Sequence, residues 1–300
     1  MLDNLHLYHF SLFKASKSVI DHLERFRRNF LMGGCEGKKK IYWVGWDVVL
    51  EPKERGGLGV GSLVSLKWAL LFKWLWRFKI DLDALWSVNW RWKKVPSDSR
   101  EINELGLDAL ISSFSVTNGP DAWSSKISTD GSIYMRDLRV LIDLKVTKQV
   151  DNPTIWLNLV PLKVIVFVWR ASMDIVPSFG ALSRRGILVH DSHCRFCDVG
   201  SDEADNLLIR CPLAHEVLNC IMNWCNFTPI QFHSIRELLE YVAVWSNCPK
   251  NQKILLAILY GYLWCTWKTI NDIVVNNVIT NVPKLADNIS SLVFNWVKHR

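Results

Sequence analysis

The chain has 300 residues, of which 49% are hydrophobic and 22% are charged, and its formal net charge at pH 7 is +7. These proportions are those of a globular chain that buries a sizeable core, and they exclude an intrinsically disordered protein. Residues 1–100 hold 18 Lys and Arg against 10 Asp and Glu, so the basic excess lies in the first third, where it suits either a polyanion such as nucleic acid or a solvated surface.

The first 80 residues are expected to hold two helices separated by an extended segment. Apolar residues recur at spacings of three, four and seven through residues 12–31, which is typical of an amphipathic helix. The β-branched and aromatic residues at 41–49 predict a short strand. The glycine cluster at 56–60 lacks the pattern of a phosphate-binding loop, so we interpret it as a turn that lets two apolar segments pack. Residues 63–78 then predict an apolar helix.

The segment from 79 to 150 changes character. Trp86, Trp90 and Trp92 alternate with basic side chains, a mixture that can stack bases and hold phosphates but that also packs within a helical core. Turn-forming residues lead to 130–142, where we expect a second short strand after a turn. The Asp-Gly-Ser sequence at 130–132 resembles the first acidic motif of a ribonuclease H. No partner set of carboxylates accompanies it, so we do not expect that enzyme.

Residues 153–226 hold the pattern that says most about chemistry. A Trp-containing apolar helix leads through a proline turn and a basic step to a Cys-x2-Cys pair, Cys194 and Cys197, and Cys211 follows a short apolar run. Thiolates at such spacings hold two loop ends on a zinc ion. The chain has 8 cysteines without the density of a disulfide framework, and we see no signal-peptide pattern. We therefore expect an intracellular protein, in the nucleus or cytoplasm, that is not secreted.

The last part of the chain is predicted to be helical. Residues 236–245 and 253–276 each give a helix, and Pro283 precedes a final one at 285–298. The longest apolar run, 254–267, is shorter than the roughly 20 residues that span a bilayer. We interpret it as a buried helix and expect no contact with a membrane.

The Cys-rich segment resembles the zinc-binding region that follows the polymerase domain in plant LINE-type (non-LTR) retrotransposon reverse transcriptases. That family's pattern runs Trp, Pro-x-Lys-x-x-x-Phe-x-Trp-Arg, Leu-x-x-Arg-Gly, Cys-x2-Cys, an acidic residue, His-Leu-Leu and a final Cys. This chain matches it at Trp156, Pro161, Lys163, Phe167, Trp169, Arg170, Leu182, Arg185, Gly186, Cys194, Cys197, Asp202, Leu207, Leu208 and Cys211.

A second set of motifs, nearer the N-terminus, carries the same resemblance. The family shows Phe-Ser-Leu-Phe, Phe-x-Trp-Gly-Gly, Lys-Ile-x-Trp-Val-x-Trp, Gly-Gly-Leu-Gly-Val and Ala-Leu-Leu-x-Lys-Trp-x-Trp-Arg-Phe. The chain has these motifs in the same order, at residues 10–13, 30–34, 40–46, 56–60 and 69–78. Met32 stands where the family usually has Trp. Two motif sets in the right order extend the resemblance over most of the chain.

The chain departs from the family at one ligand position. Asn206 stands where the family has the histidine of its zinc site, and a neutral amide oxygen is a poorer zinc ligand than imidazole. The fourth ligand is therefore open. It could be Asn206 itself, one of His190, His193 and His215, or water, and a site that has lost its zinc is the alternative.

The resemblance implies a region that grips RNA or DNA while a separate palm polymerises. The chain contains no Asp-Asp pair, the carboxylates that a two-metal polymerase needs, so we expect no enzyme and a chain that begins after the palm. No small-molecule substrate is evident. Two groups of basic residues are predicted to contact phosphate: Lys38, Lys39 and Lys40, and, near the cysteines, Arg184, Arg185 and Arg195.

Together these observations predict a mainly α fold with a few short strands. We divide it into a thumb- or connection-like region at 1–95, a linker with strand and turn at 96–152, the zinc-binding-like domain at 153–226 and a helical region at 227–300. The favoured function is zinc-assisted nucleic-acid binding by a retrotransposon-derived reverse transcriptase fragment. The alternative is a metal-free structural or protein-interaction remnant. A third is a product that does not fold alone.

Overall fold

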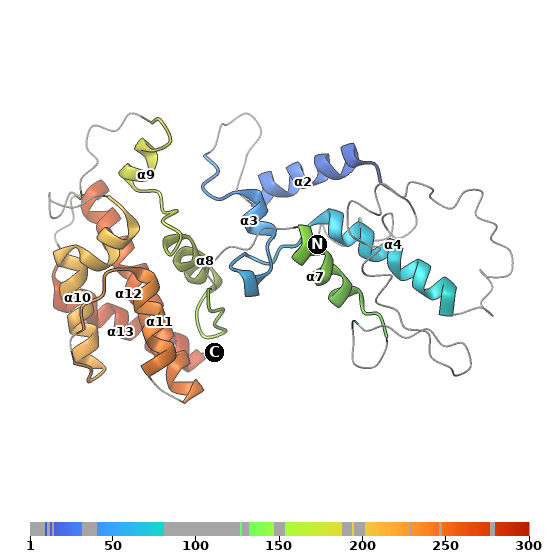
Figure 1. The fold of residues 1–300 in the computed structure, drawn as a ribbon. Helices are drawn as coiled ribbons and strands as arrows, with labels where there is room; N and C mark the ends of the chain where they lie inside the picture. The colour runs from blue at the N-terminus through green and yellow to red at the C-terminus, as the bar shows by residue number, and fades with distance from the viewer. Residues whose placement is uncertain are drawn as a thin grey trace. The chain divides into compact units, whose positions relative to one another are not determined.

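The structure is a computed structural model of the whole chain (Figure 1), and it falls into two compact units, Met1–Pro153 and Thr154–Arg300. Each unit is described by itself. The residues that the structure describes are 10, 13, 15–31, 41–80, 127, 132–146, 154–187, 194, 202–228, 230–245, 248–276 and 280–299.

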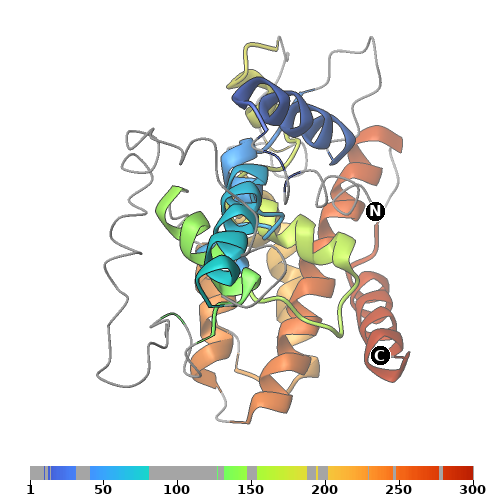
Figure 2. The same ribbon diagram turned by 90° about the vertical axis from the view of Figure 1, so that its right-hand side faces the viewer.

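In the first unit, the described helices are α2 (Lys17–Leu31), α3 (Trp46–Leu50), the apolar α4 (Leu63–Ile80) and α7 (Met135–Val146). The N-terminal half of α4 packs against α2 in a small buried cluster, and its C-terminal half packs against α7 in another. Figure 2 shows α4 (cyan) beside α7 (green).

Glu24 of α2 joins three parts of this unit. Its carboxylate accepts a hydrogen bond from the backbone N–H of Leu63 at 2.7 Å and another from the indole N–H of Trp46 at 3.0 Å. Arg27 lies 3.3 Å from the same carboxylate. A carboxylate at the first residue of a helix satisfies a backbone donor and opposes the positive end of the helix dipole. Glu24 therefore fixes where α4 begins.

The glycine cluster forms a tight turn before α4. Backbone N–H groups of Gly57 and Gly59 donate to the carbonyls of Pro52 at 3.1 Å and Glu51 at 2.8 Å. A Cβ at Gly57 would lie 2.1 Å from the carbonyl oxygen of Glu51, so no larger residue fits there without moving the backbone. The turn returns the chain onto α3, and its glycines serve packing.

The predicted mainly α fold is confirmed, but the two predicted short strands are wrong. Residues 41–45 form no strand, and α3 begins at Trp46; the expected strand at 130–142 is replaced over its described part by α7. No strand occurs anywhere among the described residues. In α7, Leu138 and Ile142 lie one turn apart and both face α4, a spacing that favours a helix over a strand.

The second unit is a bundle built on one long helix, α12 (Pro249–Asn276), which packs against α8, α10, α11 and α13. Its central residues, 255–263, are all buried, so α12 is apolar all round, as expected of a core helix. The other elements are α8 (Leu162–Ala171), α9 (Phe179–Ser183), a π-helical turn η2 (Asn206–Arg210), α10 (Pro212–Trp224), α11 (Ile235–Trp245) and α13 (Val282–His299).

Close contacts fix how α12 meets its neighbours. Gly261 faces α13, where a Cβ would lie 2.6 Å from Cγ2 of Val293, so the two helices approach closely at this point. On the α8 side, the ring of Phe167 lies 5.3 Å from Trp264 and 5.9 Å from Trp267. Within the described residues, no helix is both long and apolar enough to cross a membrane.

Candidate zinc-binding site

Two of the three predicted cysteine ligands lie together in the core of the second unit. Cys194 and Cys211 are each 1% exposed, and their Sγ atoms are 3.8 Å apart. Two thiolates on one tetrahedral zinc ion, each at about 2.3 Å, lie about 3.8 Å apart. A disulfide would need about 2.05 Å. The observed spacing therefore matches one edge of a zinc tetrahedron.

Cys211 is held at the junction of η2 and α10. Its backbone N–H donates to the carbonyl of Asn206 at 2.7 Å, and its own carbonyl accepts from the N–H of His215 at 2.8 Å. Pro212 opens α10 directly after it, where a proline has no N–H to leave unsatisfied. The π-helical turn and the start of α10 thus hold the backbone of Cys211 on both sides, and its thiol is buried in the core.

Tyr262 of α12 forms hydrogen bonds to the backbone on both sides of this junction. It is 0% exposed, and its hydroxyl donates to the carbonyl of Leu208 at 2.5 Å and also lies 3.0 Å from that of Ala214. These carbonyls flank Cys211 in the sequence. Burial raises the pKa of Tyr262 above its usual range, and Cys211 raises it further. The phenol therefore stays protonated and keeps donating to the segment that bears the thiol.

The segment before Cys194 is tied to the residues that follow the cysteine pair. Ser178 caps α9 by accepting from the N–H of Ala181 at 3.1 Å, and its hydroxyl donates to the carbonyl of Asp202 at 2.6 Å. The Asp202 carboxylate accepts from the N–H of Gly180 at 3.0 Å. Asp202 is thus a second cap of α9. The acidic position of the sequence pattern has a structural role here.

A second link runs through Asp174, whose backbone has a positive φ of 54°. Its carboxylate accepts from the N–H of Ala204 at 2.8 Å and pairs with Arg184 at 2.6 Å. Asp205, in turn, accepts from the N–H of Ile235 at 2.9 Å, at the start of α11. These carboxylates hold α9, η2 and α11 together around the two thiols.

Asn206, at the predicted position of the fourth ligand, is 8% exposed and stands first in η2. Its side-chain nitrogen is buried and makes no hydrogen bond within the described structure. A buried amide without a partner costs about 1–3 kcal/mol. The oxygen and nitrogen of an amide are nearly indistinguishable in shape, so a flipped Asn206 would place an acceptor in the same position. Two buried thiols at this spacing and a buried amide whose nitrogen has no partner are thus the described donors available to a zinc ion.

Of the remaining candidate zinc ligands, only His215 lies among the residues that the structure describes. His215 lies in the first turn of α10, where its Nδ1 is 3.2 Å from the side-chain nitrogen of Asn219. In the part of the chain that the structure describes, no three His, Cys, Asp or Glu side chains form a group that could hold a metal ion. Cys197, His190, His193, Arg195, Lys38, Lys39 and Lys40 lie outside the described residues.

The two described arginines near the site differ in their surroundings. Arg184 and Arg185 are both exposed in the turn after α9, and Arg184 is ion-paired with Asp174. Arg170, at the end of α8, donates through Nε to the carbonyl of Ile175 at 3.2 Å. Burial lowers the pKa of Arg170, and the nearby charge of Arg185 lowers it further. The positive charges of Arg170 and Arg185 therefore lie near each other.

Sequence patterns did not reveal Asp174, Ser178 or Tyr262. Tyr262 is separated by 54 residues from Leu208, the residue whose carbonyl it binds, and Asp174 by 30 residues from Ala204. The only sequence signal was local. A Ser two residues after Val176, just before a short apolar run, is a common helix N-cap.

Comparison with known proteins places the site in a defined region. Residues 139–217 match the family described as zinc-binding in reverse transcriptase. The chain is 33% identical over 88 residues to a protein of Arabidopsis thaliana named "Putative ribonuclease H protein", a match covering 29% of this chain and 14% of that protein. It is 39% identical over 70 residues to an uncharacterized mitochondrial protein of the same plant, covering 23% of this chain and 46% of that protein.

These matches cover parts of proteins. The chain spans less than half the length of either relative. No solved structure matches it. The family match begins within α7 and ends within α10, so it includes Cys194, Asn206 and Cys211.

Proposed function

We propose that residues 139–217, which match the family described as zinc-binding in reverse transcriptase, bind zinc through Cys194, Cys197 and Cys211 to support a nucleic-acid contact. The protein of which they are part would be a reverse transcriptase derived from a retrotransposon, of the LINE type that the sequence motifs resemble. The observation that carries this proposal is the 3.8 Å separation of the two buried thiols.

The donor set assigns a role to each residue. Three thiolates supply most of the charge that a zinc ion requires, and Asn206 fills the fourth position with its amide oxygen or yields it to water. Bound zinc supplies a crosslink between the segment at Cys194 and the start of α10. The hydrogen bonds of Ser178 and Asp202 fix the helix α9 that precedes Arg185.

The nucleic-acid contact is proposed from the charges around the site. Arg185 and Arg195 contact phosphate, and Lys38, Lys39 and Lys40 form a second basic group. Arg184 contributes less, because its guanidinium is already paired with Asp174. RNA and DNA are both candidate partners, and a reverse transcriptase palm is the proposed partner for synthesis. We propose that these residues bind and position nucleic acid inside a cell without catalysing a reaction.

A metal-free remnant is the second candidate, and Asn206 is the observation that favours it. Its buried amide nitrogen lacks a partner, and the core around Cys194 and Cys211 is apolar. Thiols that have lost their metal would simply pack there as small apolar groups. The region would then act only as a structural or protein-interaction surface.

Metal content by mass spectrometry of the purified, reduced chain tests the site. We expect one equivalent of zinc, retained in Cys220→Ser and lost in Cys194→Ser and Cys211→Ser. Cys220 is a matched control because it lies in α10, outside the proposed ligand set. Asn206→His should tighten zinc binding by restoring an imidazole. A chain that folds but holds no zinc, in wild type and Asn206→His alike, would establish the metal-free candidate.

Nucleic-acid binding is tested by fluorescence anisotropy of labelled single-stranded RNA and DNA over a range of salt concentrations. Each lost phosphate contact lowers the slope of log K against log salt by roughly 0.7 on a single strand. We expect this change for Arg185→Glu, and a smaller one for Arg184→Glu. Equal binding and equal salt slopes in all variants, including a triple reversal at Lys38, Lys39 and Lys40, contradict the proposal.

A further inference from the structure

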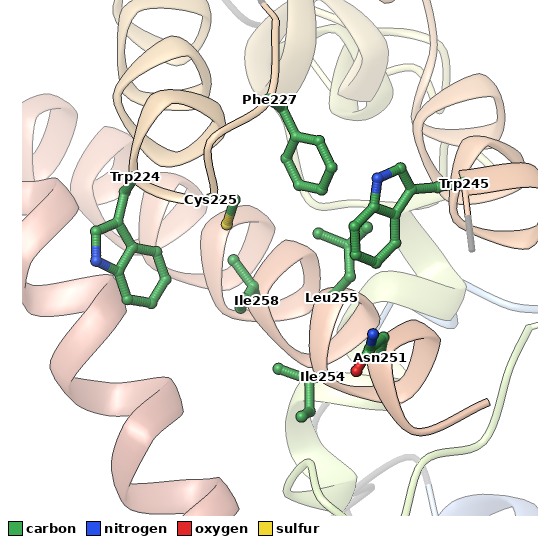
Figure 3. Close-up of a pocket in the computed structure, with 8 residues that line it drawn as sticks. All are labelled: Trp224, Cys225, Phe227, Trp245, Asn251, Ile254, Leu255 and Ile258. Carbon is green, nitrogen blue, oxygen red and sulfur yellow. The ribbon is translucent and has the colours of Figure 1, made fainter. Parts of the chain in front are cut away.

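A second feature of Thr154–Arg300 lies at the C-terminal end of α10, opposite the end that follows Cys211. The C-terminal ends of α10 and α11 and the first turns of α12 enclose a cavity of about 230 Å³ (Figure 3). Trp224 and Trp245 stand on opposite sides of it, Phe227 lies above, and aliphatic side chains of α12 form its floor. Asn251 adds one polar group at the edge.

The cavity is walled by aromatic rings that reach solvent. Trp224 is 58% exposed and Trp245 is 37% exposed. Trp245 is held in place by an edge-to-face contact with Phe227, with ring centroids 4.8 Å apart. Burial raises the pKa of the lining Cys225 to about 11, so this thiol is neutral at pH 7 and acts as apolar wall. The result is an open pocket with flat aromatic faces.

The size of the cavity limits what it takes. Pockets for drug-sized ligands measure about 300–1,000 Å³, so 230 Å³ accepts a single ring system. An amphipathic helix from a protein partner inserts several side chains along an extended groove, which one cavity of this size does not offer. A nucleobase is a flat ring with π-faces and hydrogen-bonding edges, and it matches both the walls and Asn251.

The charge beside the cavity also favours a nucleotide. Lys250 and Lys253 are exposed at the start of α12, whose first turn has no acidic residue. Neither lysine pairs with a carboxylate of the described residues. Backbone N–H groups of Asn251 and Lys250 lower the pKa of Cys248 in the same turn. This end of α12 thus favours negative charge close to the pocket.

We propose that this cavity binds one base of single-stranded nucleic acid, stacked against Trp224 and Trp245, with the flanking phosphates at Lys250 and Lys253. The inference rests on the proposed nucleic-acid binding and adds a second contact to it. The 13 residues of α10 are about 20 Å long at 1.5 Å per residue. A single strand of several nucleotides therefore reaches from the zinc region to the pocket.

The test measures anisotropy of a labelled 12-nucleotide single-stranded RNA with the full, zinc-loaded chain. Loss of base stacking on an aromatic side chain weakens binding by about 5- to 150-fold, and we expect this for Trp224→Ala and Trp245→Ala. Lys250→Gln and Lys253→Gln should each lower the salt slope by about 0.7. Phe294→Ala is the matched control, because Phe294 is an aromatic residue of α13 that is 65% exposed, and it should bind as wild type.

An oligonucleotide of the same length with abasic sites tests base stacking directly, because the affinities for the two strands are compared in the same protein. Wild type should bind the base-containing strand more tightly than the abasic one, and Trp224→Ala should bind the two equally. Trp224→Ala is preferred here because Trp224 is the more exposed of the two. Circular dichroism confirms that each variant is folded.

The outcomes separate this inference from the proposed function. If Arg185→Glu and the cysteine variants weaken binding while Trp224→Ala and base removal change nothing, the pocket inference is overturned and the zinc-region contact stands. If only the Trp variants weaken binding, the pocket stands and the zinc-region contact fails. Absence of binding in wild type overturns both. If Trp224→Ala converts a dimer to a monomer and leaves RNA binding intact, the cavity is a self-association surface instead.

Discussion

The two units of this chain are both organised around one apolar helix, but they differ in how much surrounds it. In Met1–Pro153, α4 packs against α2 with one half and against α7 with the other, and the described buried residues form two separate small clusters. In Thr154–Arg300, α12 packs against four helices, and the buried residues form one continuous cluster. The helices of this unit therefore share one set of buried contacts.

This difference bears on where function can be built. A metal or ligand site needs side chains held in place by packing and by hydrogen bonds around them. The two buried thiols belong to the continuous cluster, and the aromatic pocket rests on α12. In the first unit, by contrast, the described buried residues are divided between two small clusters. Precise sites are therefore expected in the second unit and broad contacts in the first.

Matched leucine deletions test this comparison and should give the largest effects. Leu208 and Leu138 are both 0% exposed, one in the continuous cluster and one against α4. Each change to Ala should cost about 2–5 kcal/mol of local stability. We expect Leu208→Ala to lower the unfolding midpoint of the second unit and its zinc content. Leu138→Ala should affect only the first unit.

Urea unfolding followed by circular dichroism, with zinc measured along the curve, distinguishes the two transitions. A single transition that both leucine variants shift by the same amount would show that the units unfold together. The two units would then not have independently stable cores.

Two buried tyrosines of α12 sharpen the comparison within the second unit. Tyr262→Phe removes the donor to Leu208 and Ala214 and leaves carbonyls beside Cys211 without it, so we expect a loss of about 1–3 kcal/mol. Tyr260→Phe removes one hydrogen bond, to Ile155, and should cost about 1 kcal/mol. Only Tyr262→Phe should also weaken zinc binding, and a zinc titration of both variants checks this. Equal zinc affinity in the two would separate Tyr262 from the site.

Helical periodicity predicted most of the fold because it is a local property. The predicted helices at 236–245, 253–276 and 285–298 are found at Ile235–Trp245, Pro249–Asn276 and Val282–His299. The differences lie at the ends, where caps rather than periodicity decide. In α12, for instance, the carbonyl of Cys248 accepts from the N–H of Gln252 at 3.1 Å, so the helix begins before its apolar stripe does.

The two predicted strands failed for a different reason. Val, Ile and Trp at 41–49 suit a pleated surface, but a strand needs a partner strand for its backbone groups, and the described structure contains none. Without one, Val49 is buried on one turn of helix, with Asp47 in the first turn of α3. Composition therefore predicted a strand where the backbone forms the helix α3.

The candidate site could be predicted in part from its spacing. Cys194 and Cys211 were found because ligand spacing is visible in a sequence, and the structure brings them together. Asp202 was matched as an acidic position, but its role as a cap of α9 depends on a partner 22 residues away. Long-range partners of this kind leave no local pattern, so only a three-dimensional structure assigns them.

The smallest expected effect concerns the charge of Asp202. Burial raises the pKa of this carboxyl, although the N–H groups of Gly180 and Phe179 oppose the shift. A carboxyl whose pKa rises on folding holds its proton more tightly in the folded chain. Its contribution to stability is therefore full below the unfolded pKa of about 3.9 and declines as the pH rises through the folded value.

Asp202→Asn keeps an acceptor for Gly180 but does not ionise, so it should gain stability relative to wild type as the pH rises from 3.5 to about 7. Thermal unfolding at a series of pH values measures the difference. Tyr260→Phe is the control, because its loss of about 1 kcal/mol involves no group that titrates between pH 3.5 and 7 and should not vary with pH. A difference between Asp202→Asn and wild type that is flat with pH would mean that the carboxylate is well solvated. The cap would then join α9 to η2 more loosely than the 3.0 Å contact with Gly180 indicates.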